Sequence, residues 1–353
     1  MRRRRAPGPS SRPRTGGRPI RGGSWTILCG GVWPPTTVSG GLRDPSVVAC
    51  RPDADRDGDQ VTEDGDTLRW IDVGDATDGA ASRLPSLGLG DPSGPPIVLI
   101  PGLTDGLYPV FDPRGRGLFN DVPVPMDRCR GLVVSYRHPL IGVTSTAHLA
   151  ADVATVLHRR LDRPAVLICH SMGTMVAQHL AAAHPELIAG LVLSAPLAAV
   201  DDRLRDVVGR WSGLVREGRW DAMAEDALRC SYTGAELDRR RELLELLEPS
   251  AVGQELVDRH LRLSELCLAH RPPDPFGTGE VSTLVLAGER DPVAPPDHAT
   301  SLAAASPAAR LHVLPGLAHG FPEQAPAAFS AFVTSFLGEV AGSCASWVGG
   351  PDA

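Results

Sequence analysis

The sequence of 353 residues has no run of about eighteen consecutive apolar residues, the length that a membrane-spanning helix needs. It also lacks an excess of positive charge, because 35 basic and 42 acidic side chains give a formal net charge of −7. Its seven cysteines include no Cys-x-x-Cys pair, so we expect free thiols in a reducing compartment. These absences favour a soluble, cytoplasmic protein that acts on small molecules and has no nucleic-acid or membrane partner. They leave the oligomeric state open.

The first sixty residues lack the features of a secretory signal. Arginines at positions 2–5 could begin one, but Pro, Gly and Arg dominate the residues that follow, and the apolar patch at 25–29 is too short. We therefore expect residues 1–60 to form a disordered, solvated Arg-, Pro- and Gly-rich extension rather than a nucleic-acid-binding tail. Acidic residues between positions 53 and 64 match part of an EF-hand calcium loop, but no amphipathic helix flanks them, so a solvated linker is preferred.

From residue 61 onward, short apolar runs alternate with segments of helical periodicity, a pattern typical of a parallel sheet covered by helices. A strand buried on both faces appears in the sequence as a continuous apolar run, because neither face meets water. We therefore predict an α/β fold with a mostly parallel central sheet flanked by helices. Seven runs fit strands: residues 67–73, 97–101, 131–136, 165–169, 190–194, 282–287 and 310–314.

Two segments with an apolar stripe at helical spacing are predicted to pack on this sheet, one ending before Pro164 and one beginning at Pro326. Between residues 197 and 280 the alternation stops, and helical patterns follow one another. We interpret this segment as an inserted helical cap, or lid. The predicted organisation is a core of residues 61–196 and 281–340, a cap of residues 197–280 and a flexible tail of residues 341–353.

The stretch most informative about chemistry follows the strand predicted at 165–169. Ser171 stands in Cys169-His170-Ser171-Met172-Gly173, where an apolar strand passes through a turn of small residues into a helix. A serine in such a turn exposes its hydroxyl beside the amino end of the helix, where free N–H groups favour developing negative charge. The pattern predicts a nucleophilic serine, with an ordinary turn serine as the alternative. Cys169 replaces the first glycine of the usual Gly-x-Ser-x-Gly, and cysteine is also small.

An acidic residue and a histidine follow two later strands. Asp291 comes just after the strand predicted at 282–287, and His319 lies in the loop after 310–314. Open α/β sheets build their sites at the carboxyl ends of parallel strands, so we expect both side chains to meet Ser171 there. Asp201, after the strand at 190–194, is a rival for the acid role. Asp291 is preferred because Asp201 begins the inserted segment.

These segments together resemble the α/β-hydrolase superfamily, and most closely its capped serine esterases, over about residues 61–340. The resemblance implies a catalytic triad of Ser171, Asp291 and His319, in which His319 is the base and an acyl-enzyme forms on Ser171. It also implies an oxyanion hole made by the backbone N–H groups of Leu103 and Met172. It rests on His170-Ser171-Met172-Gly173, on residues 191–196, on Gly288-Glu289-Arg290-Asp291 and on residues 316–320.

The chain departs from the family pattern near the predicted oxyanion hole. Pro101 stands where many relatives carry a histidine, which removes one supporting hydrogen bond. Tyr136-Arg137-His138-Pro139 stands where relatives often have Asp-x-Arg-Gly, and Arg114-Gly115-Arg116-Gly117 comes too early to replace it.

The expected function is hydrolysis of a small-molecule carboxylic ester or thioester by water, without a metal or an organic cofactor. A lactonase, an amidase, a carbon–carbon bond hydrolase and a cofactor-free perhydrolase use the same triad and stay open as alternatives. A serine nucleophile argues against dehalogenases and epoxide hydrolases, which place an aspartate there. A non-catalytic binding protein that keeps the fold is the alternative outside enzymology.

The remaining candidates are given ordinary roles. His170 is expected to line the site or to be structural, because neighbouring residues in such a turn point in different directions. Trp211, Trp220 and Met223 could line an apolar acyl pocket or form the core of the inserted segment. Five further histidines are predicted to be packed or solvated without acidic partners at ligand spacing: His138, His148, His158, His179 and His184.

Overall fold

The computed structural model describes residues 60–61, 67–73, 83–110, 128–246, 252–274 and 281–344. Three features of the sequence lie outside these residues: positions 1–59 of the predicted extension, the acidic residues of the partial calcium loop, and Arg114-Gly115-Arg116-Gly117. The predicted tail is described only as far as Cys344, and the last helix extends to Ser343.

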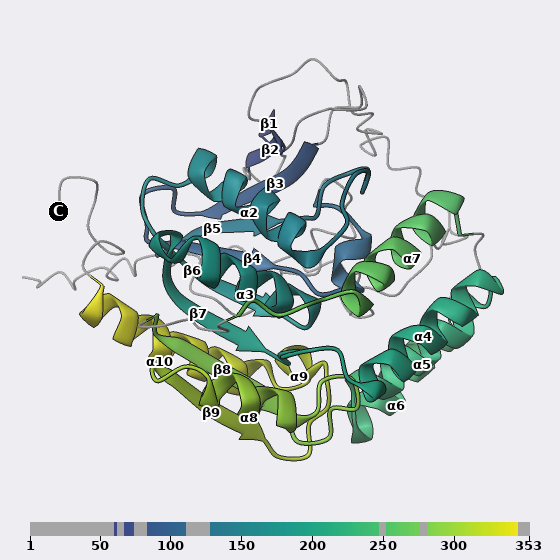
Figure 1. Ribbon diagram of the computed structural model, residues 1–353. Coiled ribbons are helices and arrows are strands. Elements are labelled where there is room, and N and C mark those ends of the chain that lie inside the picture. The colour runs from purple at the N-terminus through teal and green to yellow at the C-terminus, as the bar shows by residue number, and fades with distance from the viewer. Residues whose placement is uncertain are drawn as a thin grey trace, which may run out of the picture.

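The described strands form one sheet in the order β1-β2-β3-β5-β4-β6-β7-β8-β9 (Figure 1). Neighbours from β5 to β9 run parallel, whereas β1, β2 and β3 pair antiparallel with the next strand along the sheet. The mostly parallel sheet predicted from the sequence is thus confirmed. The strands are β1 (Gln60–Val61), β2 (Thr67–Asp72), β3 (Arg83–Gly90), β4 (Pro96–Ile100), β5 (Arg130–Val134), β6 (Ala165–His170), β7 (Ile188–Ser194), β8 (Thr283–Gly288) and β9 (Ala309–Leu314).

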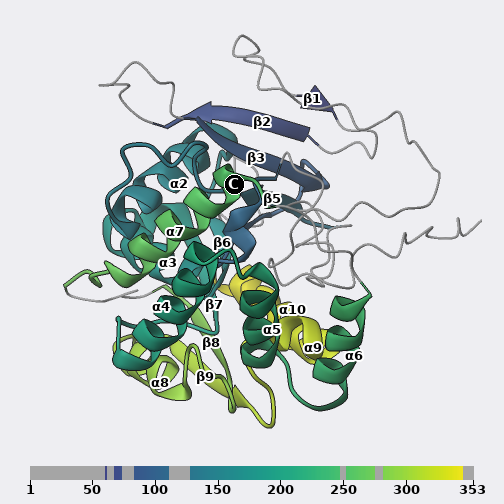
Figure 2. The same ribbon diagram turned by 90° about the vertical axis from the view of Figure 1, so that its right-hand side faces the viewer.

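Helices cover both faces of the sheet (Figure 2). Helices α2 (Thr146–Arg160) and α3 (Met172–Ala183) pack side by side on one face, and α8 (Pro296–Ala304) packs beside β8 and β9. Helix α10 (Pro326–Ser343), preceded by the short α9 (Phe321–Gln324), lies on the opposite face. Its apolar stripe is buried as predicted, and Phe336 and Val340 come close to Gly190 of β7.

Four helices are inserted between β7 and β8, in the segment where the sequence predicts helices. Helix α4 packs against α5 and α7, and α5 packs against α6. Trp211, Trp220 and Met223 are buried within the hydrophobic core, so they form part of the packing between these helices. Figure 1 shows the inserted helices on the side toward which β7 points. They are α4 (Asp202–Arg216), α5 (Trp220–Ser231), α6 (Gly234–Glu245) and α7 (Gln254–Leu268).

Strand β3 is not predicted by the sequence analysis. Its residues include Pro85, Gly88 and Gly90, which are poor strand formers. The strand forms because it pairs with β2 on one side and β5 on the other, and the Pro85 carbonyl accepts a hydrogen bond from the Ser135 amide at 3.1 Å. Pairing with strands distant in the sequence therefore overrides local propensity here.

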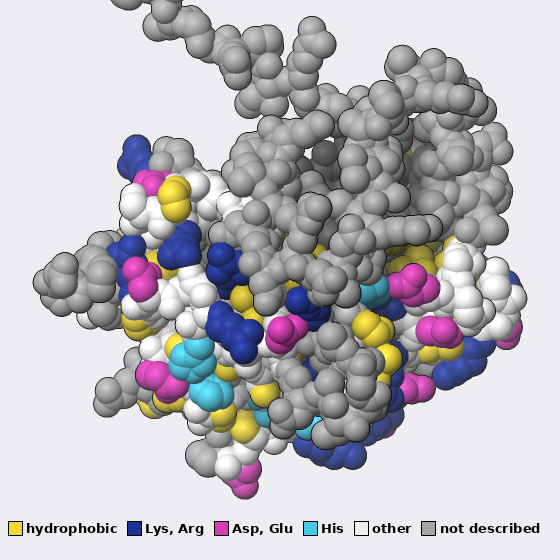
Figure 3. All heavy atoms as spheres, turned by 90° about the horizontal axis from the view of Figure 1, so that it is seen from above, with side chains coloured by type: hydrophobic (Ala, Val, Ile, Leu, Met, Phe, Trp, Pro, Cys, Tyr) yellow, Lys and Arg dark blue, Asp and Glu magenta, His cyan; other side chains and the backbone are white. Residues whose placement is uncertain are grey.

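Charged side chains of both signs are mixed on the described surface. On the face shown in Figure 3, arginines and acidic side chains lie interspersed among apolar and neutral ones. Within the described segments, no helix combines the length and the apolar character that crossing a bilayer requires.

Candidate active site

Ser171 connects β6 to α3 through a strained turn. It is the N-cap residue of α3 and has φ 50° and ψ −120°, a conformation that residues other than glycine rarely adopt. Its amide donates to the Ser194 carbonyl of β7 at 3.0 Å. Gly173 permits the close approach of α3 to β4, since a Cβ there would lie 2.6 Å from the Ile100 carbonyl oxygen. The neighbouring strands therefore hold the turn in its strained shape.

Ser171, His319 and Asp291 form a continuous chain of hydrogen bonds. Ser171 Oγ lies 2.9 Å from His319 Nε2, and His319 Nδ1 lies 2.7 Å from Asp291 Oδ2. All three residues are buried. A neutral imidazole with its proton on Nδ1 donates to Asp291 and accepts from the Ser171 hydroxyl, so one tautomer satisfies both bonds. The structure thus brings together the three side chains that the sequence selects.

The second oxygen of Asp291 fixes the carboxylate. Its Oδ1 accepts hydrogen bonds from the amides of Val293 and Ala294, both at 2.8 Å, which leaves Oδ2 directed at His319. The rival acid has a different role. Asp201 is the N-cap residue of α4, and its Oδ1 accepts from the Leu204 amide at 2.8 Å. A side chain in this position stabilises the start of a helix.

The inserted helices hold the loop that carries His319. The His319 and Gly320 amides donate to the carbonyls of Cys230 and Ser231, at the end of α5, at 3.2 and 2.7 Å. Gly320 must lack a side chain, because a Cβ would lie 2.7 Å from the Tyr232 ring. Tyr232 in turn donates its hydroxyl to Glu323. The junction between α5 and α6 is therefore part of the support of the imidazole.

One predicted oxyanion-hole amide lies at the first residue of a helix, and the other lies in a loop. Met172 begins α3, and Leu103 follows β4. A Cβ on Gly102, next to Leu103, would be 3.2 Å from Ser171 Cβ, so this loop passes close to the serine. Among the hydrogen bonds of the described residues, none uses the Leu103 or Met172 amide as donor.

Residues at which the chain departs from the family pattern form hydrogen bonds that support the site region. The Tyr136 hydroxyl donates to the Pro101 carbonyl at 2.5 Å, and so supports the loop where the histidine of relatives is missing. Burial raises the pKa of Tyr136 well above its ordinary value, which keeps the hydroxyl protonated as a donor. Arg137 pairs with the carboxylate of Asp152 on α2 through two hydrogen bonds.

The two residues before Ser171 differ in exposure and contacts. Cys169 is fully buried, and burial raises the pKa of its thiol. His170 is partly exposed, with Nδ1 3.2 Å from Ser194 Oγ and its ring centroid 5.0 Å from that of His319. Burial, and then the charge of His319, hold the pKa of His170 well below its ordinary value. His170 is therefore a neutral ring beside His319 and Ser194, and both roles predicted for it, lining the site or supporting the structure, agree with these contacts.

Arg259 of α7 ties the inserted segment to the loop after β4. Its guanidinium is buried and donates to the carbonyls of Gly106, Arg137 and Tyr136 at 2.8, 3.1 and 3.3 Å. Sequence reasoning missed Arg259, Tyr136, Tyr232 and Asp105. Asp105 stands three positions after Gly102. Its nearness in the sequence to Leu103, the predicted oxyanion amide, could have identified it as a candidate. The other three act through residues distant in the sequence.

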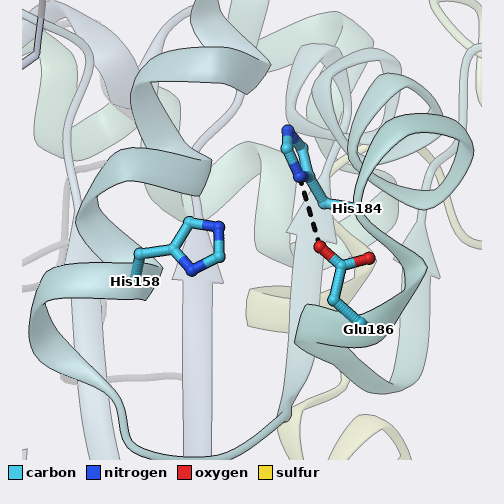
Figure 4. A group of neighbouring side chains, drawn as sticks. All are labelled: His158, His184 and Glu186. Atoms are coloured by element: carbon cyan, nitrogen blue, oxygen red, sulfur yellow. Dashed lines mark hydrogen bonds and ion pairs between the residues drawn. The ribbon is translucent and has the colours of Figure 1, made fainter.

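Three side chains at the opposite edge of the sheet could hold a metal ion. His158 of α2, the α3 C-cap residue His184, and Glu186 of the short helix η3 (Pro185–Leu187) place their ligand atoms within 4.8 Å of one another (Figure 4). His184 Nδ1 lies 3.4 Å from Glu186 Oε1, and His138 pairs with Glu255 at 3.0 Å. The prediction that these histidines lack acidic partners was therefore wrong for His184 and His138, because the carboxylates come from a following turn and from α7.

This histidine cluster is separate from the serine site. Imidazole nitrogens and carboxylate oxygens are zinc ligands. The cluster lies near the amino ends of β6 and β7, whereas Ser171 follows the carboxyl end of β6. A metal held there would therefore stand at the other edge of the sheet from the Ser171 hydroxyl.

The sheet order, the serine turn after β6 and the loops after β8 and β9 define an α/β-hydrolase fold. Residues 97–332 match the model of the alpha/beta hydrolase family, and the chain belongs to that family. Lipase LipV of Mycobacterium tuberculosis is 46% identical over 66 residues, which cover 18% of this chain and 25% of the lipase. The chain thus matches about a quarter of the length of this curated relative.

Solved structures share the fold at low identity. MGS-M2, an alpha/beta hydrolase enzyme from a Medee basin deep-sea metagenome library, has a TM-score of 0.61 at 18% identity, covering 73% of this chain and 94% of its own. The enol-lactonase from Burkholderia xenovorans LB400 has a TM-score of 0.60 at 20% identity, covering 76% and 99%. A thermophilic esterase from Thermogutta terrifontis has a TM-score of 0.58 at 22% identity, covering 77% and 98%. These similarities support the fold and leave the substrate open.

Proposed function

We propose that this protein is a serine hydrolase that cleaves a small-molecule carboxylic ester, or a thioester, through an acyl-enzyme on Ser171. The observation that carries the proposal is the hydrogen-bonded chain from Ser171 Oγ through His319 to Asp291, with distances of 2.9 and 2.7 Å. A nucleophile, a base and an orienting acid at these distances form the minimum set for acyl transfer to serine. Membership of the alpha/beta hydrolase family supports the same conclusion.

In the first half-reaction, His319 Nε2 takes the hydroxyl proton while Ser171 Oγ bonds to the carbonyl carbon of the substrate. The carbonyl oxygen becomes an oxyanion, which accepts hydrogen bonds from the Leu103 and Met172 amides, and losing one such donor costs about 3 kcal/mol of barrier. Asp291 stabilises the imidazolium through Nδ1. The bond to the leaving alcohol then breaks, and His319 gives it the proton.

In the second half-reaction, water replaces the alcohol. His319 removes a proton from the water as its oxygen attacks the acyl carbon on Ser171. The tetrahedral intermediate breaks down with release of Ser171 Oγ, which recovers its proton from His319, and the carboxylic acid leaves. The scheme balances with the substrate, water and residues of this chain as the reactants and proton carriers.

We propose that helices α4 to α7 act as a cap over the site. Two attachments support this role: the hydrogen bonds from the His319 loop to the end of α5, and those from Arg259 of α7 to the loop after β4. Both attachments lie beside the catalytic loops. The cap would enclose a small-molecule substrate and shield the acyl-enzyme from bulk water.

Labelling with a fluorophosphonate tests the nucleophile directly, because the reagent phosphonylates an activated serine. We expect an adduct on the peptide that contains Ser171 in the native protein and no adduct in Ser171→Ala or His319→Ala. Ser194→Ala is the matched control, because Ser194 is a buried serine on the neighbouring strand whose side chain, among the described residues, bonds His170 alone.

The outcome separates the enzyme from the binding protein. The enzyme hypothesis is supported if the adduct is lost in Ser171→Ala and His319→Ala but forms in Ser194→Ala. A screen of esters and thioesters, followed by lactones, is then justified. A folded native protein that forms no adduct would contradict the triad mechanism and favour a non-catalytic binding protein.

A further inference from the structure

A second carboxylate, that of Asp105, lies beside the nucleophile without taking part in the chain of hydrogen bonds through His319. Asp105 begins the short helix η2 (Asp105–Leu107), just after the predicted oxyanion amide of Leu103. Its Oδ2 and Ser171 Cβ are each 3.2 Å from the position that a Cβ on Gly102 would take. The carboxylate of Asp105 and the nucleophilic side chain therefore border the same small region.

The two oxygens of Asp105 have different surroundings. Oδ2 accepts a hydrogen bond from the Gly102 amide at 3.2 Å. Oδ1 accepts none within the described part of the chain, yet it is not among the polar atoms that are sealed from solvent without a partner. The side chain as a whole is partly exposed. One oxygen therefore holds the loop, and the other keeps hydrogen-bonding capacity that the described residues do not use.

The loop that carries Asp105 is held firmly in place. Arg259 donates to the Gly106 carbonyl at 2.8 Å, and a Cβ on Gly106 would lie 2.8 Å from the Tyr136 ring. Leu263 of α7 packs against the same glycine. A side chain on so fixed a loop presents its free oxygen in a defined direction, as recognition requires.

No described cation pairs with Asp105. Arg259, which contacts the adjacent residue, donates to backbone carbonyls, and no salt bridge of the described residues includes Asp105. Burial raises the pKa of Asp105, and the Gly102 hydrogen bond and the charge of His319 oppose that shift. Because part of the Asp105 carboxylate is removed from water, a donor from a ligand would relieve part of that desolvation cost.

Resting on the proposed function, we propose that Asp105 Oδ1 accepts a hydrogen bond from a donor that the substrate carries close to its scissile carbonyl. The preferred acyl groups would then be those of 2-hydroxy or 2-amino acids, which place a hydroxyl or an ammonium group on the carbon next to the carbonyl. Simple alkanoyl groups would leave Oδ1 unpaired. Acyl groups with a carboxylate at that carbon would be repelled.

Four matched ethyl esters test the inference: propionate, 2-hydroxypropionate, 2-aminopropionate and the monoethyl ester of methylmalonic acid. We expect kcat/KM of the native protein to be at least about tenfold higher for the hydroxy or amino ester than for propionate, the effect of one charge-assisted hydrogen bond. The methylmalonate ester should be the poorest of the four. A preference for the hydroxy ester identifies a hydroxyl donor, and one for the amino ester identifies an ammonium donor.

Two variants connect the preference to Asp105. Asp105→Leu also removes the Gly102 hydrogen bond, so the ratio of kcat/KM for the preferred ester to kcat/KM for propionate is the diagnostic quantity, and it should fall by about tenfold. Asp105→Asn, which has nearly the same shape and keeps an acceptor oxygen, should retain part of a hydroxyl preference and lose an ammonium preference. Asp258→Leu removes an exposed acid of α7 and should leave the ratios unchanged.

Fluorophosphonate labelling of Ser171 in each variant separates failure of this inference from failure of the proposed function. Native protein that labels on Ser171 but hydrolyses propionate and both donor esters equally well would overturn the role of Asp105. An undiminished preference in a labelled Asp105→Leu protein, or an ammonium preference that persists in a labelled Asp105→Asn protein, would overturn it too. Absence of labelling in the native protein would instead overturn the serine mechanism on which the inference rests.

Discussion

The two oxygens of Asp291 have different partners, and in the proposed mechanism only one of them acts on His319. Oδ1 accepts the Val293 and Ala294 amides, and Oδ2 bonds His319 Nδ1. Asp291→Asn can keep the acceptor toward both amides while its NH₂ group faces Nδ1 and favours the wrong imidazole tautomer. By analogy with the equivalent change in serine proteases, we expect kcat for ester hydrolysis to fall by about 10⁴. Steady-state kinetics with the best ester substrate would measure this.

Asp201→Asn is the control for that experiment. Asp201 caps α4, and asparagine is as good a helix N-cap as aspartate. Kinetics close to those of the native protein are therefore expected. Equal losses in the two variants would contradict the assignment of Asp291 as the acid.

At the scale of an element, the loop after β4 is supported by a hydrogen bond from Tyr136, two residues after the end of β5. Tyr136 donates to the Pro101 carbonyl, and Tyr136→Phe keeps the ring while removing the donor. We expect kcat to fall by about tenfold with little change in KM, because in the proposed mechanism the Leu103 amide stabilises the transition state more than the ground state. Urea unfolding should also show a loss of about 1 to 2 kcal/mol, since the carbonyl loses its partner.

The two measurements on Tyr136→Phe distinguish its roles. A lower stability with unchanged kcat would mean that Tyr136 holds the fold without orienting the oxyanion amides. A rise in KM with unchanged kcat would mean that the loop binds substrate and transition state alike.

The elements differ in how well the sequence predicts them. The parallel strands are continuous apolar runs, so β4 and β6 were located within one residue at each end. Strand β3 carries proline and two glycines and exists through its pairing partners, which no local pattern reveals. Ser171, Asp291 and His319 each follow a recognisable strand, and this placement made them predictable.

The supports of the site were not predictable in the same way. Arg259 reaches Gly106 across 153 positions, and Tyr136 reaches Pro101 across 35. Each is a single side chain that meets a backbone carbonyl, and a carbonyl is present at every position of the chain. The sequence therefore contains no pattern that marks such a pair, and only the packed fold shows it.

At the scale of the whole molecule, buried neutral histidine should make folding sensitive to acid. His260 of α7 is fully buried against Trp220, and neither ring nitrogen has a hydrogen-bond partner. Burial, and then the charge of Arg216, lower the pKa of His260 to about 4. The unfolded chain takes up the proton first, near pH 6.5, so stability is retained above pH 6.5 and lost as the pH falls toward 4.

His260→Leu tests this contribution. We expect the native protein to lose about 2 to 3 kcal/mol of unfolding free energy from His260 between pH 7 and pH 4.5, and the leucine variant to lose that much less. Urea denaturation at several pH values would measure both slopes. Other buried histidines, such as His270, leave a residual slope in the variant. The same dependence of unfolding free energy on pH in both proteins would contradict the assignment of this acid sensitivity to His260.

The attachments of the inserted helices also bear on how this chain could be recombined with its relatives. Exchanging residues 202–268 for the equivalent segment of another family member would be an obvious way to transplant a specificity. In this chain, however, the carbonyls of Cys230 and Ser231 accept hydrogen bonds from the loop that carries His319. Arg259 in turn donates hydrogen bonds that hold the loop after β4. A functional chimera should therefore keep the backbone path at 230–232 and the arginine at 259, and draw its new residues from the rest of the segment.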